Sequence, residues 1–543
     1  MGIPGATQRE TIRKAASVLA SRGVVPFVWA EPDEAGVQFV TAWAEFSEEA
    51  KVIQPPDGFK DPADLWKSIH DVDNFKLKIW DLHDRALPAE QYVSESLREA
   101  VSEARRIGDR FLTTHNLHEL VATEVQNNGF AGDTSPVEIA FFAFFSALLQ
   151  PVVKGFVGDL PLRIMLLGPS SAGKSEIVRQ ALRLIPTDAF ERFDGASERS
   201  LIYSPAEFKH KTVVMWEADS IPEDGPAATA FRGLTDGEGV RYDVVVEGDR
   251  GEGFVTRHYE KEGPTALITT GTRSATRQTE TRLLVLEVQP DSAQIQNTLL
   301  SLVISAAGMR TATDVSHFHA AYTWIRLAGS RRVVIPQEFG KRIAKLMPKG
   351  AMKHERTQRD FPQLLSLIKT ITMVRQLYRA KDDDGRLITE RADYETAVSL
   401  ASPLFQIAAS DGVTEAVRGV VEAVGKVTQT GEMFATSKQV AELIERSNST
   451  AHDNLKRAEK LGLLNNTNPG SGRRAQWVTD APLPETTSLP SPDEVYGLAA
   501  PEELPEGRKV EVNEPELVSI APSGFPDDFG EVGSNNEFSW ESH

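Results

Sequence analysis

The stretch Gly168-Pro169-Ser170-Ser171-Ala172-Gly173-Lys174-Ser175 decides the predicted fold of this chain of 543 residues. It has the spacing G-x-x-x-x-G-K-[ST], in which a glycine-containing backbone wraps around phosphate groups. Residues 162–167 (LRIMLL) before it form an apolar run typical of a buried strand, and residues 176–184 (EIVRQALRL) after it have the periodicity of a helix. A strand, this loop and a helix in that order predict a nucleotide-binding α/β domain.

The residue types of this loop suit a nucleotide with bound magnesium. Its glycines permit close approach of the backbone, and the amides at the start of the helix would face the phosphates with the positive end of the helix dipole behind them. Lys174 would place its charge beside the β and γ phosphates, and the Ser175 hydroxyl would complete the coordination of Mg²⁺. We therefore expect ATP and Mg²⁺ as ligands of residues 168–175; the alternative is an incidental turn rich in Gly and Ser.

The composition is that of a globular protein with several domains. Hydrophobic residues make up 40% and charged residues 25% of the chain, whose length exceeds that of a single core. The most apolar run, residues 139–149 (IAFFAFFSALL), is too short to span a bilayer and predicts a buried helix. No targeting signal opens the chain, so we expect a cytoplasmic protein without membrane contact. The absence of cysteine excludes disulfides, thiolate zinc sites and a cysteine nucleophile.

The net charge of −19 is concentrated at the carboxyl end. Residues 481–543 contain 14 acidic residues against Arg508 and Lys509, which leaves about −7 for the other 480 residues and permits local basic patches. The same segment is rich in Pro, Ser and Gly and predicts a disordered acidic tail. Its aromatic residues Phe525, Phe529 and Trp540 indicate a protein-docking motif, or they belong to a solvated tail without a partner.

Residues 436–480 have the pattern of a winged helix-turn-helix. Thr436 to Gln439 fit a capping box that starts one helix, and a second helix follows a turn near Ser447. Two short strands around residues 463–464 and 476–478 would enclose a wing that carries Arg473 and Arg474. The second helix would direct Asn454, Lys456, Arg457 and Lys460 outward, where they suit a DNA groove or backbone. Domains of this kind also serve as protein contacts, so both roles stay open.

Acidic residues follow the next strand after the phosphate-binding loop. Residues 211–219 (KTVVMWEAD) predict an apolar strand that ends in Glu217 and Asp219. This is the position at which phosphate-loop ATPases place a Mg²⁺ ligand and the base that polarises the attacking water. We expect Glu217 to be the main acid and Asp219 the second; the alternative is a strand that ends in a charged turn.

Further strands follow. Residues 240–247 and 254–260 alternate in hydropathy around a glycine-rich turn that carries Arg250, which predicts a β-hairpin. Residues 265–270 (TALITT) predict a strand that ends in hydroxyl groups at Thr270. Arg282 precedes another apolar run, residues 283–288.

The phosphate-binding loop, hairpin and hydroxyl-ended strand together resemble the AAA+ ATPases of the helicase clade, such as the superfamily-three and minichromosome maintenance helicases. The resemblance implies that Arg250 contacts DNA from the tip of the hairpin and that Thr270 senses the γ-phosphate. It also implies that Arg282 is an arginine finger that reaches the ATP of a neighbouring subunit, in a ring that is a homo-hexamer. The alternative for Arg282 is a surface arginine at the start of a strand.

The amino-terminal residues resemble the second half of a TOPRIM domain, the metal-binding fold of bacterial primases. Residues 27–36 (FVWAEPDEAG) match D-x-D-x-x-G with Glu31 and Asp33 as the two acids, and residues 60–64 (KDPAD) match its K-D-P-x-D loop. Acids two positions apart at a strand end can reach one hard cation. The strand and glutamate that precede a G-x-P-G-A turn in this family have no counterpart before residues 2–6. We therefore expect either a truncated chain or a remnant domain, and no primer synthesis by this chain alone.

The fold class expected from these features is α/β, with a phosphate-loop NTPase core. The domain prediction comprises a partial TOPRIM domain (1–84), a helical connector (85–150), the ATPase (151–310), a helical lid (311–410), a winged helix (411–480) and a disordered tail (481–543).

This order resembles the primase-helicases of bacteriophages and integrative elements over nearly all of residues 1–480. The resemblance implies an ATP-dependent DNA helicase or translocase in replication, with single-stranded DNA in the ring channel, duplex DNA at the winged helix and replication proteins at the tail. Two alternatives stay open: an ATP-regulated DNA-binding regulator without unwinding activity, and a nonenzymatic replication scaffold.

Overall fold

The computed structural model assigns the chain's contacts to two units, Met1–Leu498 and Ala499–His543. The structure describes residues 9–31, 34–56, 58–152, 160–193, 200–204, 206–217, 225–236, 239–247, 254–272, 282–289, 292–309, 313–347, 357–409, 413, 415–470, 474–483 and 489–497.

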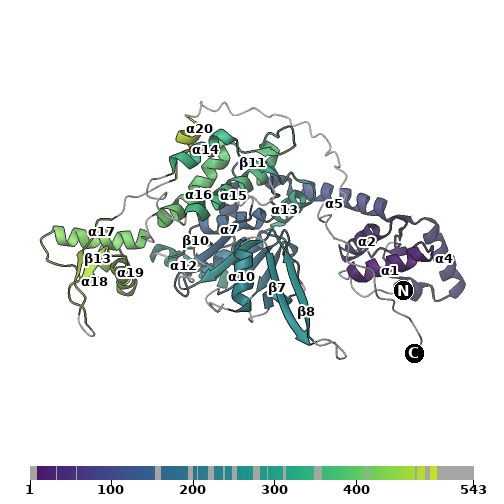
Figure 1. The fold of residues 1–543 in the computed structure, drawn as a ribbon, viewed down its shortest axis with the longest axis horizontal. Helices are drawn as coiled ribbons and strands as arrows, with labels where there is room; N and C mark the ends of the chain where they lie inside the picture. The colour runs from purple at the N-terminus through teal and green to yellow at the C-terminus, as the bar shows by residue number, and fades with distance from the viewer. Residues whose placement is uncertain are drawn as a thin grey trace. The chain divides into compact units, whose positions relative to one another are not determined.

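The centre of the first unit is a parallel five-stranded sheet in an otherwise helical region, which confirms the expected α/β class (Figure 1). The order across the sheet is β10 (Leu284–Glu287), β4 (Arg163–Leu167), β9 (Ala266–Gly271), β6 (Thr212–Met215) and β5 (Phe190–Phe193). From β4 the chain passes to the outer strand β5, returns through β6 and β9, and crosses β4 to form β10.

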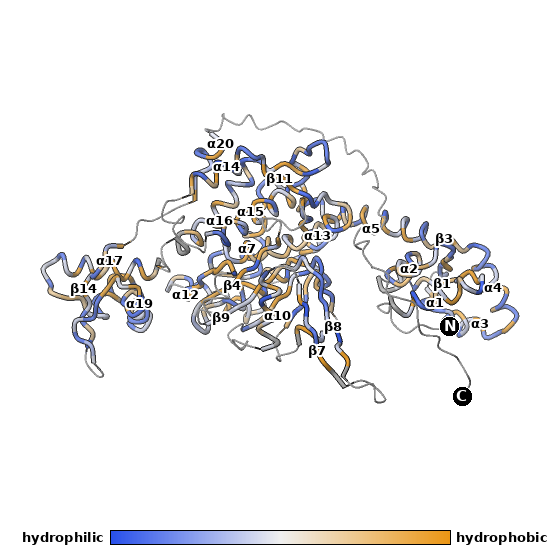
Figure 2. Tube along the Cα trace, in the orientation of Figure 1, coloured by the Kyte–Doolittle hydropathy of each residue, from blue (hydrophilic) through white to orange (hydrophobic). Residues whose placement is uncertain are grey.

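Strands β4, β6 and β9 are buried along their whole length, as their largely apolar sequences require (Figure 2), whereas the edge strand β5 (FERF) is partly exposed. Alternate residues of β4 enter different cores: Ile164 and Leu166 belong to one hydrophobic cluster, and Met165 and Leu167 to another. Helices α7 (Ser135–Ser146) and α8 (Lys174–Arg183) contribute to the first cluster; α9 (Ser200–Tyr203) and α10 (Pro226–Asp236) contribute to the second. The sheet therefore lies between two helical layers. The buried helix expected over residues 139–149 is confirmed as far as Ser146, where α7 ends.

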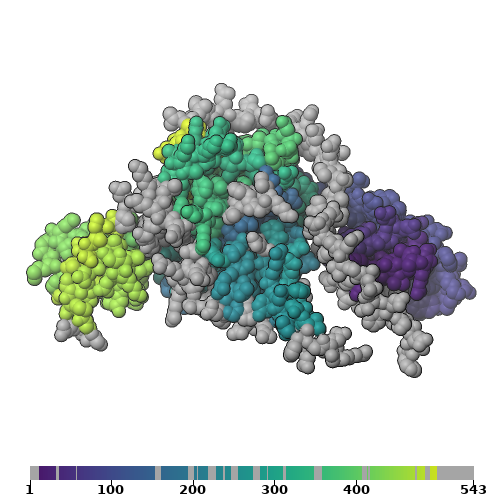
Figure 3. Space-filling model, in the orientation of Figure 1, coloured from purple at the N-terminus to yellow at the C-terminus, as the bar shows by residue number. Residues whose placement is uncertain are grey.

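A long antiparallel hairpin follows α10. Its strands β7 (Gly239–Glu247) and β8 (Phe254–Glu262) pair with each other from Gly239↔Glu262 to Glu247↔Phe254 and form a sheet of their own. Figure 1 shows both strands running side by side beyond the central sheet, and the same segment projects from the surface in Figure 3. The predicted hairpin is confirmed; Arg250, at its predicted tip, lies outside the described residues.

Helices before and after the sheet complete its first core. Tyr322 and Ile325 from one of these helices and Leu367 and Ile371 from another are fully buried there. The elements are α5 (Ala89–Leu112), α6 (Leu117–Asn127), α12 (Ser292–Ala306), α13 (Ser316–Ala328), β11 (Val333–Val334), α14 (Gln337–Leu346), α15 (Thr357–Val374), β12 (Leu387–Ile388) and α16 (Arg391–Ala409), with 3-10 turns at Thr187–Ala189 and Gln376–Tyr378.

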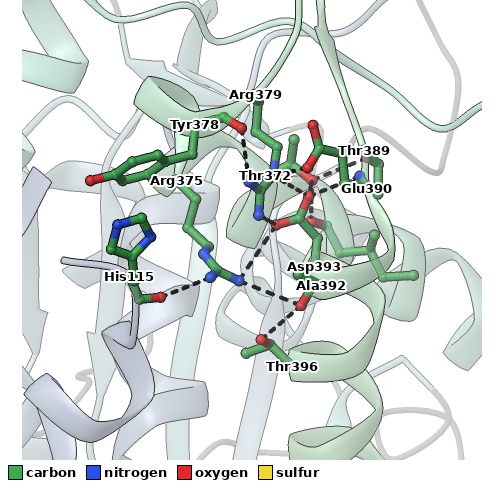
Figure 4. A network of polar contacts seen from close by, with 11 residues as sticks. His115, Thr372, Arg375, Tyr378, Arg379, Thr389, Glu390, Ala392, Asp393 and Thr396 are labelled. Carbon is green, nitrogen blue, oxygen red and sulfur yellow. Dashed lines mark hydrogen bonds and ion pairs between the residues drawn. The ribbon is translucent and has the colours of Figure 1, made fainter. Parts of the chain in front are cut away.

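A buried ion pair fixes α16 to the preceding segment (Figure 4). The Asp393 carboxylate is fully buried and accepts hydrogen bonds from Arg379 Nε and Nη2 at 2.7 and 2.6 Å. It also accepts one from the Thr372 hydroxyl at 3.0 Å and one from the Glu390 amide at 3.0 Å. The charge is thus compensated by Arg379, by Arg375 Nη1 at 4.0 Å and by two further donors, as a buried carboxylate needs.

The amino-terminal elements form a separate small sheet, with β1 parallel to β2 and β2 antiparallel to β3. The predicted K-D-P-x-D loop is wrong in part. Asp61 caps a helix by accepting a hydrogen bond from the Asp64 amide, so Pro62, Asp64 and Leu65 are helical, with proline at the position where it needs no hydrogen bond. The elements are α1 (Arg9–Ser21), β1 (Phe27–Trp29), α2 (Glu34–Phe46), β2 (Lys51–Ile53), α3 (Pro62–Ile69), α4 (Val72–Asp84) and β3 (Leu87–Pro88).

The helices and strand pair predicted over residues 436–480 are present. Thr436 and Gln439 form the predicted capping box, and Trp477 is fully buried against Ala451 and Leu455 in one cluster. The elements are α17 (Glu415–Gln429), α18 (Ser437–Leu443), α19 (Asn448–Lys460), β13 (Leu464–Asn466) and β14 (Trp477–Thr479).

The prediction of disorder throughout residues 481–543 is wrong for residues 489–497. These contain the short helix α20 (Pro492–Tyr496), where Val495 is fully buried and Leu489 is 4% exposed in the core shared with α16. Asp493 pairs with Arg391 at 2.5 Å, and the Tyr394 hydroxyl donates to the Pro490 carbonyl at 2.9 Å. The two apolar residues were too few to predict a core by themselves, but they complete one supplied by other helices. Residues 498–543 lie outside the description.

Among the described helices, none combines the length and the hydropathy needed to cross a membrane.

Candidate functional site

The predicted phosphate-binding loop joins β4 to α8, and the structure describes all of its residues. Ser171 (φ 66°) and Gly173 (φ 89°) adopt left-handed backbone conformations that turn the chain into the helix. A side chain at Gly168 would place Cβ 2.3 Å from the Val288 carbonyl oxygen, so only glycine fits beside the end of β10. The loop therefore has the compact backbone that its sequence predicts.

Lys174 is the first residue of α8 and is 8% exposed. Its Nζ donates hydrogen bonds to the carbonyl oxygens of Gly168 (2.7 Å) and Pro169 (2.8 Å), within the loop itself. Ser175 is exposed beside it, and Gly173 provides no side chain to cap the first amides of the helix. The loop thus combines a lysine ammonium, a hydroxyl and a positive helix end, which are the groups that a polyphosphate with bound magnesium requires.

Glu217 and Thr270 lie at the same edge of the sheet as this loop, the edge formed by the carboxyl ends of the strands. The Gly168 amide donates to the carbonyl oxygen of Gly271 at 3.2 Å, and Gly271 ends β9. The adjacent Thr270 is 4% exposed, and its hydroxyl accepts a hydrogen bond from the Glu217 amide at 3.1 Å. A continuous set of contacts therefore joins the loop, the predicted sensor residue and the predicted main acid.

Glu217 has a conformation that is unusual for its residue type. Its φ of 56° lies in the left-handed region, where a non-glycine residue carries strain, and its side chain is exposed. The Thr270 contact holds this backbone in place, and an exposed carboxylate at this edge can bind a hard cation or accept a proton from water. Asp219, the second predicted acid, lies outside the described residues.

Arg282 lies at the opposite edge of the sheet, formed by the amino ends of the strands, because it comes just before β10 and the strands are parallel. Its Nη1 contacts both carboxylate oxygens of Asp236, each at 2.8 Å. Gln363 accepts a hydrogen bond from the Arg163 amide (3.0 Å) and donates one to the Arg282 carbonyl oxygen (3.3 Å). The structure therefore does not bring Arg282 to the loop of its own chain.

Arg163, the first residue of β4, is 6% exposed at this second edge. Burial lowers the pKa of its guanidinium to about 10, the attraction of Asp236 raises that pKa, and the repulsion of Arg282 lowers it. Sequence analysis missed both Arg163 and Asp236. The only signal was an arginine inside an otherwise apolar strand, which alone does not identify a partner.

The amino-terminal acids form a smaller second candidate site. Glu31 follows β1 and pairs with Lys60 at 3.3 Å, and Trp29 donates to the Lys60 carbonyl oxygen at 2.9 Å. A Cβ at Gly36 would lie 2.1 Å from the Glu31 carbonyl oxygen, so the predicted motif glycine allows α2 to approach β1. Asp33 lies outside the described residues, and the described part of the chain holds no group of three or more His, Asp or Glu able to bind a metal ion.

The predicted DNA-binding side chains of α19 are only partly available. Lys456 and Lys460 are exposed, but Asn454 is 8% exposed and donates to the Thr450 carbonyl oxygen at 3.0 Å, so its predicted outward orientation is wrong. Arg457 is half-buried and forms an ion pair with Glu287 at 3.2 Å. Arg474 is exposed, and Arg473 lies outside the described residues.

No protein-family model matches the sequence, and a search of curated proteins finds no match either.

Proposed function

We propose that this protein is an ATP-dependent DNA helicase or translocase of the primase-helicase type, acting in the replication of a phage or mobile element. The observation that carries the proposal is the hydrogen-bonded edge at which the 168–175 loop contacts the end of β9 and Thr270 holds Glu217. This edge brings together, in one chain, groups that suit binding of a triphosphate and activation of water.

The path of the chain through the sheet supports a ligand at this edge. From β4 the chain first goes to one side, to β5, and later crosses to the other side, to β10. Ligands of open parallel sheets bind outside the carboxyl ends of the strands where the strand order reverses. The 168–175 loop occupies that position, because it follows the carboxyl end of β4.

The proposed chemistry divides among four side chains. Lys174 would leave the loop carbonyls that it now contacts and bind the β and γ phosphates, and the Ser175 hydroxyl and Glu217 would face the magnesium ion. The magnesium ion would neutralise charge on the phosphates. Glu217 would also orient the attacking water, while Thr270 fixes the backbone from which it projects. Asp219 is the second proposed acid.

The hairpin and Arg282 support a motor. The paired strands β7 and β8 extend beyond the sheet and carry exposed Arg257 and also Arg241, which pairs with Glu260 at 2.8 Å; such guanidinium groups suit contact with a nucleic acid backbone. Arg282 and the loop occupy opposite edges of one sheet, so one copy could offer its arginine to the loop of the next. We therefore include a homo-hexameric ring and DNA contact by Arg250 in the proposal.

The experiment is an ATPase assay with and without single-stranded DNA. We expect hydrolysis that needs Mg²⁺ and is stimulated by the polynucleotide, and Lys174→Ala to abolish it, because no other ammonium group is positioned within the loop. Lys209→Ala is the matched control, since Lys209 forms a surface ion pair with Glu262 at 2.8 Å. Near-normal hydrolysis by Lys174→Ala would refute the site assignment.

The exposed basic residues near the carboxyl end favour a second candidate, a DNA-binding regulator controlled by ATP. Lys456, Lys460 and Arg474 are exposed on a helix-turn-helix arrangement with a strand pair. This candidate predicts sequence-specific binding to duplex DNA and no stimulation of ATPase activity by single strands.

A further inference from the structure

We propose that Asp236 is the positioning residue for Arg282 and couples this arginine to the β7–β8 hairpin. The inference rests on the proposed function, in which Arg282 acts on the nucleotide of a neighbouring copy. It adds a route by which DNA bound to the hairpin would change the rate of hydrolysis at that nucleotide site.

The contact between the two residues is specific. Arg282 Nη1 lies 2.8 Å from each oxygen of the Asp236 carboxylate, so this nitrogen of the guanidinium group is held by both oxygens. The Arg282 side chain is 27% exposed, so it is accessible at the surface while it is held. Among the described residues, Asp236 is the only carboxylate that forms an ion pair with it.

Asp236 is also directly connected to the hairpin. It is the last residue of α10, and only residues 237 and 238 separate it from Gly239, the first residue of β7. A Cβ at Gly233 would lie 2.4 Å from the Gly239 carbonyl oxygen, and a Cβ at Gly239 would lie 2.0 Å from that of Lys261. The last turn of the helix, the first residue of β7 and the paired end of β8 therefore touch through backbone atoms.

A shared core provides a second connection. Leu234 of α10, Val240 of β7 and Leu283, which follows Arg282, are at most 1% exposed and belong to one hydrophobic cluster. Close-packed side chains transmit displacement because there is no free volume to absorb it. A movement at the base of the hairpin would thus reach both residues of the ion pair.

The charge of the buried Arg163 explains why the Asp236 carboxylate is needed to keep Arg282 in place. Its buried guanidinium is close enough for its charge to interact with both Asp236 and Arg282. Replacing Asp236 by a neutral residue would remove the attraction that offsets the repulsion between the Arg163 and Arg282 guanidinium groups. Arg282 would then be repelled from its present position.

The test compares Asp236→Asn, Asp236→Glu and Arg282→Ala with the wild-type protein. The matched control is Glu262→Gln, which breaks an ion pair of similar exposure, Lys209–Glu262 at 2.8 Å, at the base of the same hairpin. For each full-length protein, kcat and KM for ATP are measured with and without single-stranded DNA, beside thermal unfolding.

We expect Asp236→Asn to lower the DNA-stimulated kcat roughly 100-fold, the usual effect of misplacing a catalytic group by about 1 Å, with KM changed less than about twofold. Asp236→Glu should recover part of the loss, since it retains the charge. Glu262→Gln should behave as wild type. In the Arg282→Ala background, Asp236→Asn should cause no further decrease.

Wild-type kcat and DNA stimulation in Asp236→Asn would overturn the inference. So would a further decrease in the Arg282→Ala background, since Asp236 would then act independently of this arginine. If Asp236→Asn fails to fold, Asp236→Glu tests the inference instead. The inference then requires that Asp236→Glu lowers kcat without changing KM, and an unchanged kcat would overturn it. Absence of DNA-stimulated ATPase in the wild type would instead contradict the proposed function, so the two failures are distinguishable.

Discussion

At the scale of single residues, backbone contacts decide which side chains the site tolerates. Gly168 lies so close to Val288 that a methyl group would lie 2.3 Å from a backbone oxygen. Because that oxygen follows β10 and the Gly168 amide is bound to the end of β9, neither strand can move without disturbing the sheet. The loop is thus positioned by its two neighbouring strands.

Gly168→Ala should therefore shift the loop and lower the free energy of unfolding by about 1–3 kcal/mol, the usual cost of overpacking. ATPase activity should fall with it. Gly419→Ala in α17 is the control, because its Cβ would meet no atom within 4 Å and its backbone is helical. We expect that variant to be as stable as wild type or more stable. Equal stability of the two variants in denaturant titrations would contradict the geometry.

His210 is half-buried and connects the start of β6 to the end of α7. Its Nδ1 donates to the Ala147 carbonyl oxygen at 2.9 Å. Burial lowers the pKa of this imidazole below 6.5; the hydrogen bond raises that pKa, and the charges of Arg331 and Lys209 lower it further. Between the folded and unfolded pKa values the unfolded chain binds more protons, so this residue reduces stability as pH falls below about 6.5.

His210→Asn should remove that pH dependence. Asparagine tolerates the φ of 56° at this position and can donate to the same carbonyl group. The free energies of unfolding of variant and wild type should converge at pH 8 and diverge below pH 6.5, with the variant more stable relative to wild type. Burial also lowers the pKa of His317, but this residue is present in both proteins and changes their free energies of unfolding equally.

His70→Asn is the control for this comparison, since His70 has a similar φ of 52° but is exposed. A constant difference between wild type and His210→Asn across this pH range would show that His210 is not the group responsible.

At the scale of elements, the Arg379–Asp393 pair fixes α16 against the segment after α15 (Figure 4). Both side chains are at most 4% exposed, so the loss of Asp393 would leave Arg379 buried with only the half-exposed Glu390 carboxylate, at 3.5 Å, as its counter-ion.

Asp393→Asn should lower the free energy of unfolding by about 3–5 kcal/mol, because Arg379 would remain charged and buried. Glu395→Gln on the same helix is the control. It breaks the more exposed ion pair with Arg391 at 2.7 Å and should cost less than about 1 kcal/mol. Denaturant titration of both variants measures the difference, and a loss below 1 kcal/mol in Asp393→Asn would contradict the account of this pair.

The sequence predicted best those elements whose signals are local. Strand β4, the 168–175 loop and α8 were predicted to within about two residues, because a continuous apolar run, the glycine spacing and the helical periodicity are sufficient there. Contacts between distant residues were not predictable: Asp236 and Arg282 are 46 positions apart, and the burial of Val495 depends on helices formed some 100 residues earlier. The outward side of α19 was predicted from periodicity alone, which could not exclude the local hydrogen bond of Asn454 or the ion pair of Arg457.

At the scale of the whole molecule, the proposal places the parts of one nucleotide site on two copies of the chain. The loop, Glu217 and Thr270 share one edge of the sheet, and Arg282 lies at the other. A ring would unite the two edges of successive copies.

Mixing impaired variants tests this arrangement. Lys174→Ala should lack turnover and Arg282→Ala should retain only a small residual turnover, while an equimolar mixture should turn over faster than either variant alone, because some interfaces would combine an intact loop with an intact arginine. The control is each variant mixed with itself at the same total concentration, with particle mass measured in the presence of nucleotide. A fully active, monomeric Arg282→Ala would rule out the ring.

The central claim is that triphosphate cleavage at the 168–175 loop drives movement along DNA. Its most direct measurement is displacement of a labelled strand from a partial duplex with a single-stranded extension, in the presence of Mg²⁺ and ATP. The account predicts displacement by the wild type, none by Lys174→Ala, and none when a nonhydrolysable analogue replaces ATP. Hydrolysis that proceeds at the same rate with and without DNA and displaces no strand would contradict it.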